Sequence, residues 1–366
     1  MVRSPTDKNG ILSEIDIVPL READLQDVAD LIQAMHPVSQ DILLLRSHSR
    51  DYYHWMYYQN PAGNAFVFGA RHEGRLISCF AMAPKWFKID RSELLCGKTM
   101  DMFTHPDYQG LGLMNILASK VFETAQKSGI TFWFVTPSKN SYPIFLNKWQ
   151  YVESFELTYR FSVLNFKPLL EKLITPSAFS RIIGTMINAT RSMNVLPKNS
   201  IKQIEVHPVN EFTEEVDILW ANFHLNHPVI QIRNSKYLNW RYLANPDSYE
   251  VYDFKKAGAL IGIIVLKQTI RNGLRIGEIV DYLFLDNNKQ ILRMMLIWAK
   301  RHFQKAGCAV VQCWVINSSL MEKKIMNAGL KKKRKQLKIL LSPNVPSSSV
   351  YDKNNWFITQ GDGNDI

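Results

Sequence analysis

The stretch THPDYQGLGLMN, residues 104–115, has the composition and spacing of an anion-binding turn. Gln109 is followed by Gly110 and Gly112, and the residues beyond them recur at helical apolar spacing. The alternating residues 98–104 before the turn predict a strand. A strand, a glycine-bearing turn and a helix in direct succession leave the first helical N–H groups without partners. An anion can therefore bind to these groups.

Two other phosphate-binding motifs do not fit this turn. No Gly-Lys-Ser/Thr follows it, as a P-loop requires, and the third glycine of a dinucleotide fingerprint is missing. The pattern resembles the Q/R-x-x-G-x-G/A turn of the GNAT acetyltransferase superfamily, in which a strand, the turn and a helix hold the pyrophosphate of coenzyme A. The positions that match this motif are Gln109, Gly110, Leu111, Gly112, Leu113 and Met114.

The resemblance extends to both sides of the turn. Upstream, THPDYQG is similar to the V-x-P-x-x-R/Q-G run of the family. Downstream, the apolar strand ITFWFVTP and a helix beginning SKNSYPIFLNKWQYV, with Asn140 as its asparagine, match the next strand and the last helix. Two positions depart from the pattern, because Met114 replaces a small residue and Gln150-Tyr151 replaces Gly-Phe. These departures do not exclude a longer or unusual acyl chain as the transferred group.

The resemblance also implies how the coenzyme and the acyl group are held. The pantetheine arm is expected to pair with the backbone of Met102, Phe103 and Thr104, and Asn140 joins the cofactor-binding residues. In the family an amine attacks the thioester directly, without a covalent enzyme intermediate. A backbone N–H on the strand is the natural donor to the developing oxyanion. A base must also deprotonate the ammonium, and an acid must protonate the leaving thiolate.

The acid and the base are not fixed by the sequence. Family enzymes often use a tyrosine seven residues beyond the helix asparagine, but Asn147 stands there. We assign Tyr142 as the candidate acid, with ordinary packing at the helix start as the alternative. Asp101 is the candidate base or an anchor for the amine, with a chain of waters as the alternative. Its counterpart Asp281 in the second half favours a structural role for both aspartates.

An internal repeat divides the chain into two similar halves. W-x-Y-x-x-N-P occurs within residues 51–61 and again within residues 236–246, at a constant offset of 185 (240 − 55). Each copy precedes two strand-like runs joined by a turn, then a further strand, a helix, a strand and a helix. The repeat therefore predicts two copies of one α/β domain. We interpret the motif as structural, with its aromatic residues fastening a helix end before the proline.

The expected fold is α/β, with two tandem GNAT-like domains, each a mixed, mostly antiparallel sheet flanked by helices. We place an N-terminal, acyl-CoA-binding and catalytic domain at residues 1–163 and a helical connector at 164–202. A degenerate C-terminal domain at 203–366 is expected to shape the acceptor site. Its turn, LDNNKQILRMM, has no glycine, and Asp286 would repel a pyrophosphate. We therefore expect one coenzyme per chain.

Composition restricts the partners and the compartment. The 366 residues carry a net charge of +11, which suits acidic ligands without choosing among them. The basic run at residues 331–335 is interpreted as a solvated turn and the start of a strand, so nucleic acid is not expected as a partner. No apolar run is long enough to span a membrane, and the polar start suggests a cytoplasmic protein. The four cysteines lack zinc spacing, so we expect reduced thiols and no metal.

These observations predict an acyl-CoA-dependent N-acyltransferase, most simply an N-acetyltransferase with acetyl-CoA as donor. The acceptor is expected to be the amine of a small molecule or an amino sugar. Aromatic surface for a ring-bearing acceptor could come from four residues that could equally be core: Trp86, Phe87, Tyr108 and Trp133. Two alternatives remain open, an aminoacyl-tRNA-dependent transferase of the peptidoglycan-bridge type and a non-catalytic acyl-CoA-binding protein. The oligomeric state is also open.

Overall fold

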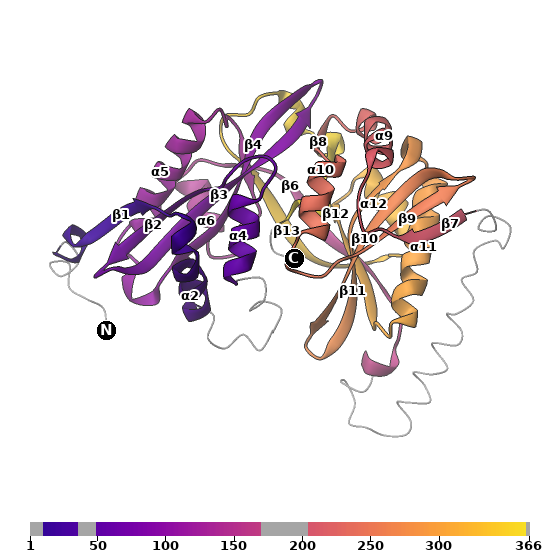
Figure 1. Ribbon diagram of the computed structural model, residues 1–366, viewed down its shortest axis with the longest axis horizontal. Coiled ribbons are helices and arrows are strands. Elements are labelled where there is room, and N and C mark those ends of the chain that lie inside the picture. The colour runs from indigo at the N-terminus through magenta and orange to yellow at the C-terminus, as the bar shows by residue number, and fades with distance from the viewer. Residues whose placement is uncertain (1–9, 36–48, 170–203, 364–366) are drawn as a thin grey trace.

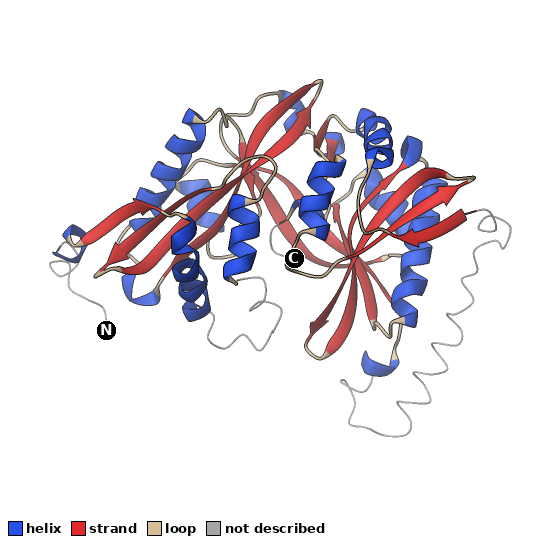
Figure 2. Cartoon of the chain, in the orientation of Figure 1, coloured by secondary structure: helices blue, strands red, loops and turns tan. Residues whose placement is uncertain are grey.

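The computed structural model describes residues 10–35, 49–169 and 204–363 of the chain. These residues form two lobes, each a strongly twisted sheet with helices packed against it (Figure 1). Figure 2 shows that strands run through both lobes and that helices lie against the faces of the sheet. The predicted helical connector lies outside the described residues from position 170 onward.

The first lobe follows the order that the sequence predicts. Its strands are β1 (Ile15–Pro19), β2 (Phe66–His72), β3 (Arg75–Ile89), β4 (Ser92–Thr104) and β5 (Trp133–Val135). Its helices are α2 (Leu25–Met35), α4 (Arg50–Tyr58), α5 (Leu113–Lys127) and α6 (Tyr142–Asn147). Strands β1 to β4 are antiparallel neighbours, and β5 is parallel to β4. Helix α5 buries its apolar stripe on β2 and β3 through Leu113, Leu117 and Val121.

The second lobe repeats this order. Its strands are β7 (Ile204–Pro208), β8 (Val229–Gln231), β9 (Glu250–Lys256), β10 (Ala259–Arg271), β11 (Leu274–Phe284), β12 (Val310–Ile316) and β14 (Trp356–Phe357). Its helices are α9 (Glu214–Phe223), α10 (Ser235–Leu238), α11 (Lys289–Lys305) and α12 (Leu320–Asn327). Strand β11 is parallel to β12, as β4 is to β5, and β14 is parallel to β8. The predicted class, two tandem GNAT-like domains with mostly antiparallel sheets, is confirmed.

The two lobes exchange their last strands. The sheet order is β1-β2-β3-β4-β5-β13-β6-β12-β11-β10-β9-β7, with β6 at Val152–Val163 and β13 at Lys332–Leu341. Strand β6, from the first half of the sequence, pairs with β12 of the second lobe, and β13 pairs with β5 of the first. The two exchanged strands also pair with each other. The boundary at residue 163 therefore separates the halves in sequence but cuts across the pairing of the sheet.

The two copies of the W-x-Y-x-x-N-P repeat meet where the lobes join. Trp55 on α4 and Trp240 in the π-helical turn η5 (Asn239–Leu243) stack with their ring centroids 4.8 Å apart. The indole N–H of Trp55 donates to the Trp240 carbonyl oxygen at 2.8 Å, and that of Trp240 to the Trp55 carbonyl oxygen at 3.2 Å. Both rings are buried. The structural interpretation of the motif is confirmed, and the motif additionally joins the lobes.

The largest buried apolar cluster runs from α2 and α4 of the first lobe into the core of the second. The four cysteines, Cys79, Cys96, Cys308 and Cys313, are buried, and none forms a disulfide. Within the described ranges, no helix is long and apolar enough to cross a membrane.

Candidate active site

The predicted coenzyme turn lies between the end of β4 and the start of α5. Gly110 and Gly112 have φ values of 80° and 79°, a left-handed conformation that glycine adopts without a Cβ penalty. Gly112 is the N-cap residue of α5 and supplies no side chain to cap its amides. The Gln109 side chain donates to the Thr104 carbonyl oxygen at 3.2 Å and so fastens the turn to the strand. The first N–H groups of α5 are thus presented without a capping side chain.

The corresponding turn of the second lobe is closed by its own side chains. Asn288 is the N-cap of α11, and its Oδ1 accepts from the N–H groups of Gln290 and Ile291 at 2.9 and 3.4 Å. The Lys324 ammonium donates to Oδ1 of the neighbouring Asn287 at 2.6 Å. The helix amides that an anion would need are therefore already occupied.

The parallel pair β4 and β5 diverges beside the coenzyme turn. Among the described residues, its register comprises Gly97 with Trp133 and Lys98 with Phe134, whereas β4 continues to Thr104. The residues predicted to hold pantetheine, Met102 to Thr104, all lie on this diverging part. Two of their carbonyl oxygens already accept side-chain hydrogen bonds, that of Phe103 from Ser78 and that of Thr104 from Gln109.

Asp101 lies at a bulge of β4, within this diverging part. The register with β3 shifts there, and Asp101 has a φ of 51°. The hydroxyl of Tyr57, on α4, donates to Asp101 Oδ2 at 2.7 Å. Burial, and then the charge of Asp101, raise the pKa of Tyr57 well above its usual value, so the tyrosine stays protonated. The repeat motif thus positions the candidate base directly.

The second lobe contains the same tyrosine and aspartate pair. Tyr242 donates to Asp281 Oδ2 at 2.7 Å. Asp281 also accepts from the Thr359 hydroxyl at 2.9 Å and from Arg233 at 3.0 Å. Near this pair the chain leaves no space, because a Cβ on Gly361 would overlap the Tyr242 hydroxyl and lie 2.9 Å from Asp281 Oδ2. The C-terminal segment therefore packs directly against Asp281 and Tyr242.

Tyr142 and Asn140 lie at the start of α6. The helix begins at Tyr142 and not at Ser138 as predicted, because Ser138 and Ser141 form a local hydrogen-bonded turn ahead of it. Asn140 is exposed in that turn. The Tyr142 hydroxyl donates to Glu153 and lies 3.1 Å from the Lys338 ammonium. A role as acid would require Tyr142 to leave this cluster or to pass its proton through it.

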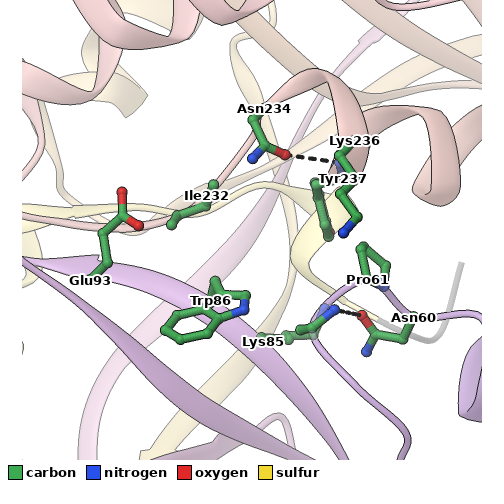
Figure 3. A pocket seen from close by; sticks show the side chains of 10 residues that line it. Asn60, Pro61, Lys85, Trp86, Glu93, Ile232, Asn234, Lys236 and Tyr237 are labelled. Atoms are coloured by element: carbon green, nitrogen blue, oxygen red, sulfur yellow. Dashed lines mark hydrogen bonds between the residues drawn. The ribbon is translucent and has the colours of Figure 1, made fainter.

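His105, next to the turn, accepts a hydrogen bond from the Asp107 N–H at 3.3 Å and so is a local hydrogen-bonding residue. Of the four aromatic candidates for an acceptor surface, Phe87 and Trp133 are core residues. Trp86 is 42% exposed and lines a cavity between the lobes, shown in Figure 3. Lys85, which is buried beside this cavity, was not among the residues singled out from the sequence. Its position inside the apolar run CFAMAPKWF does indicate a buried lysine. No cluster of three or more metal-ligating side chains occurs within the ranges described.

Comparison with known proteins extends these observations. A family model for the acetyltransferase (GNAT) domain matches residues 16–147. N-myristoyltransferase from Saccharomyces cerevisiae, solved with bound myristoyl-CoA, has a TM-score of 0.60 at 13% identity, over 93% of this chain and 87% of that one. A probable N-acyltransferase of unknown function from Enterococcus faecalis V583 has a TM-score of 0.57 at 11% identity, over 89% and 72%.

A GCN5-related N-acetyltransferase from Anabaena variabilis has a TM-score of 0.59 at 10% identity, over 89% of this chain and 72% of that one. No curated protein matches the sequence. Two lobes of this topology, with a helix whose N-cap residue is glycine beside a diverging strand pair, define an α/β protein of the GNAT fold. Residues 16–147 match the GNAT acetyltransferase domain, and the second lobe shares the fold of these solved structures.

Proposed function

We propose that the protein transfers an acetyl group from acetyl-CoA directly to the amine of a small molecule or an amino sugar. The observation that carries this proposal is the uncapped, glycine-bearing start of α5 beside the divergence of β4 from β5. The turn from Gln109 to Met114 would hold the pyrophosphate, and the backbone of Met102 to Thr104, with Asn140, would hold the pantetheine arm. The first lobe would carry catalysis, and the second would shape the acceptor site.

The donor is tested by calorimetry with coenzyme A, acetyl-CoA and acyl-CoA esters of increasing chain length. One of the similar structures contains myristoyl-CoA, so the series extends to that length. We expect acetyl-CoA to bind at micromolar concentration and longer chains to give no gain in affinity. Absence of binding of both acetyl-CoA and free coenzyme A below millimolar concentration would refute the proposal. Tighter binding with each added methylene would instead assign a longer acyl group.

Asp101 is proposed as the base or as the anchor of the acceptor amine, and Tyr142 as the acid. Asp101→Asn is expected to lower kcat by about 100-fold without changing the affinity for the coenzyme, because a proton acceptor is lost from the reaction alone. Tyr142→Phe is expected to act in the same way. The measurement is thiol release from acetyl-CoA over an amine panel. Asp281→Asn, the matched change in the second lobe, should lower the melting temperature instead.

An Asp101→Asn protein with full activity and the stability loss of Asp281→Asn would assign Asp101 to structure alone. If the wild-type protein binds acetyl-CoA but releases no thiol with any amine, the non-catalytic alternative replaces the proposal. The tRNA alternative is tested by filter binding at several salt concentrations, where steep salt dependence supports it.

Binding stoichiometry tests the unequal roles of the lobes. We expect one coenzyme per chain, because Asn288 occupies the amides of α11 whereas Gly112 leaves those of α5 uncapped. The test is a calorimetric titration with coenzyme A, with Asn288→Ala as the comparison variant. The variant removes the cap, but the turn before α11 still has no glycines like those before α5, so the stoichiometry should stay at one. A wild-type value of two would overturn the division of roles between the lobes.

A further inference from the structure

A cavity of about 250 Å³ lies between the lobes. The first lobe contributes the loop that follows α4 and the adjoining ends of β3 and β4, and the second contributes the segment around α10 (Figure 3). The lining residues are Asn60, Pro61, Ala62, Lys85, Trp86, Glu93, Ile232, Asn234, Lys236 and Tyr237. Its location at the junction of two lobes is a usual one for a small-molecule site.

Lys85 gives the cavity a buried amine. Its side chain is 3% exposed, and its nitrogen donates to Gln231 Oε1 at 3.3 Å, the contact of a neutral amide and not of a carboxylate. Burial lowers the pKa of Lys85 well below its usual value. The charged groups that add to this effect are Arg241, Lys98 and Arg233, opposed by Asp362. The cavity therefore disfavours the protonated amine, and an anionic ligand beside Lys85 would favour it.

Tyr237 also lines the cavity. The residue is 8% exposed, and its hydroxyl is buried without a hydrogen-bond partner in the described part of the chain. Since this hydroxyl has almost no accessible surface, the cavity does not present it to a ligand.

The rest of the lining limits what else the ligand contains. Trp86, Pro61 and Ile232 provide apolar surface. Lys236 adds a second, exposed ammonium, and the exposed Glu93 provides the one carboxylate among the lining residues. A ligand with an acidic group toward Lys85 and an apolar or ring-shaped portion against Trp86 would satisfy each of these groups.

We propose that this cavity binds a carboxylate or phosphate group of the acceptor, so that the acceptor is an acidic amine and not a simple one. This inference rests on the proposed acyltransferase function, whose acceptor it narrows. Lys85 is the positioning residue in this assignment, since it holds the acidic group while the amine reacts elsewhere.

The test compares matched pairs of amines that differ by one acidic group. 4-(Aminomethyl)phenylacetate against 4-methylbenzylamine tests the carboxylate, with the amine separated from the acid by a ring, and glucosamine 6-phosphate against glucosamine tests the phosphate. Calorimetry on the full chain is expected to show at least one acidic member binding about 10-fold tighter than its partner, as a charge-assisted hydrogen bond would give. The same member should have the higher kcat/KM in thiol release. Equal affinity within both pairs would overturn the inference.

Three variants link this preference to the cavity. Lys85→Met should abolish it, and Tyr237→Phe, which removes a hydroxyl that the cavity does not present to a ligand, should leave it unchanged. Lys88→Met is the charge-matched control, because Lys88 lies on the same strand but donates to the carbonyl oxygens of His224 and His227. An acid preference that survives in Lys85→Met would overturn the inference.

A further variant separates this inference from the proposed function. Gly112→Glu is expected to lose the coenzyme but keep the acid preference in calorimetry, because the glycine is not part of the cavity. A wild-type protein that binds the acids but no coenzyme would refute the proposed function and leave the cavity assignment standing. A protein that binds the coenzyme but neither acid would refute the cavity assignment and leave the proposed function standing.

Discussion

Replacing Gly112 with glutamate is expected to abolish binding of coenzyme A and acetyl-CoA. The new carboxylate would start at the first amides of α5, where the proposed pyrophosphate lies, and would both repel it and occupy its space. The fold should persist, because a Cβ on Gly112 meets no atom within 4 Å. The φ of 79° nevertheless costs a side chain about 1 kcal/mol. Calorimetry of the purified variant measures the loss.

Gly129→Glu is the matched control for this change. Gly129 follows the other end of α5, has a φ of 88°, and its Cβ would also meet no atom within 4 Å. Both variants therefore carry the same charge and a similar backbone strain. We expect no greater loss in melting temperature for Gly112→Glu than for Gly129→Glu, because a carboxylate is favourable at a helix N-terminus and unfavourable at its C-terminus. Only Gly112→Glu should lose the coenzyme. If the two variants bind coenzyme A equally well, the pyrophosphate does not lie at this turn.

Arg233→Met is expected to be among the most destabilising single substitutions in the chain. Arg233 is fully buried, with its guanidinium 3.0 Å from Asp281 and 2.6 Å from Asp362. Burial alone would lower the pKa of Arg233, but the two carboxylates outweigh it and raise the pKa. Removing the arginine leaves two buried carboxylates without their cation. The expected loss is about 3–5 kcal/mol in the free energy of unfolding.

Urea denaturation measures this loss, and Arg71→Met is its control. Arg71 also pairs with two carboxylates, Asp24 at 2.6 Å and Asp27 at 2.5 Å, but these side chains are 27% and 45% exposed. Water can therefore solvate the carboxylates that remain, so the expected cost is below about 1 kcal/mol. Similar costs for Arg71→Met and Arg233→Met would show that the C-terminal segment contributes little to the second lobe.

The elements of the fold were predictable because their signals are local. The strand, turn and helix around Gly112 follow from residue spacing within one stretch of sequence. The second lobe follows from the register of Trp55 with Trp240, and the absence of glycine near Asn288 marks the turn that is closed. Capping and left-handed glycine conformations depend on neighbouring residues, which is why a single sequence indicates them.

The contacts between distant segments were not predictable. Apolar and polar residues alternate along β6, and this pattern fits pairing with a strand of either lobe. The sequence of β6 therefore does not indicate that it pairs with β12 of the second lobe. The C-terminal segment gives no sign in its composition that Thr359 and Asp362 reach Asp281 and Arg233. The cavity between the lobes is lined by Lys85 and Tyr237, which are far apart in the sequence, and only the assembled lobes show that both are buried beside one space.

The exchange of β6 and β13 has a consequence for the origin of the molecule. If the final strand of each of two identical subunits had paired with the sheet of the other subunit, joining the subunits end to end would give this strand order. The two stacked tryptophans, Trp55 and Trp240, would then mark the former twofold axis. Each half would have been incomplete before the fusion, since its sheet ended in the strand of its partner. Two separately expressed halves, cut between residues 170 and 203, should accordingly recover the native fold only when mixed.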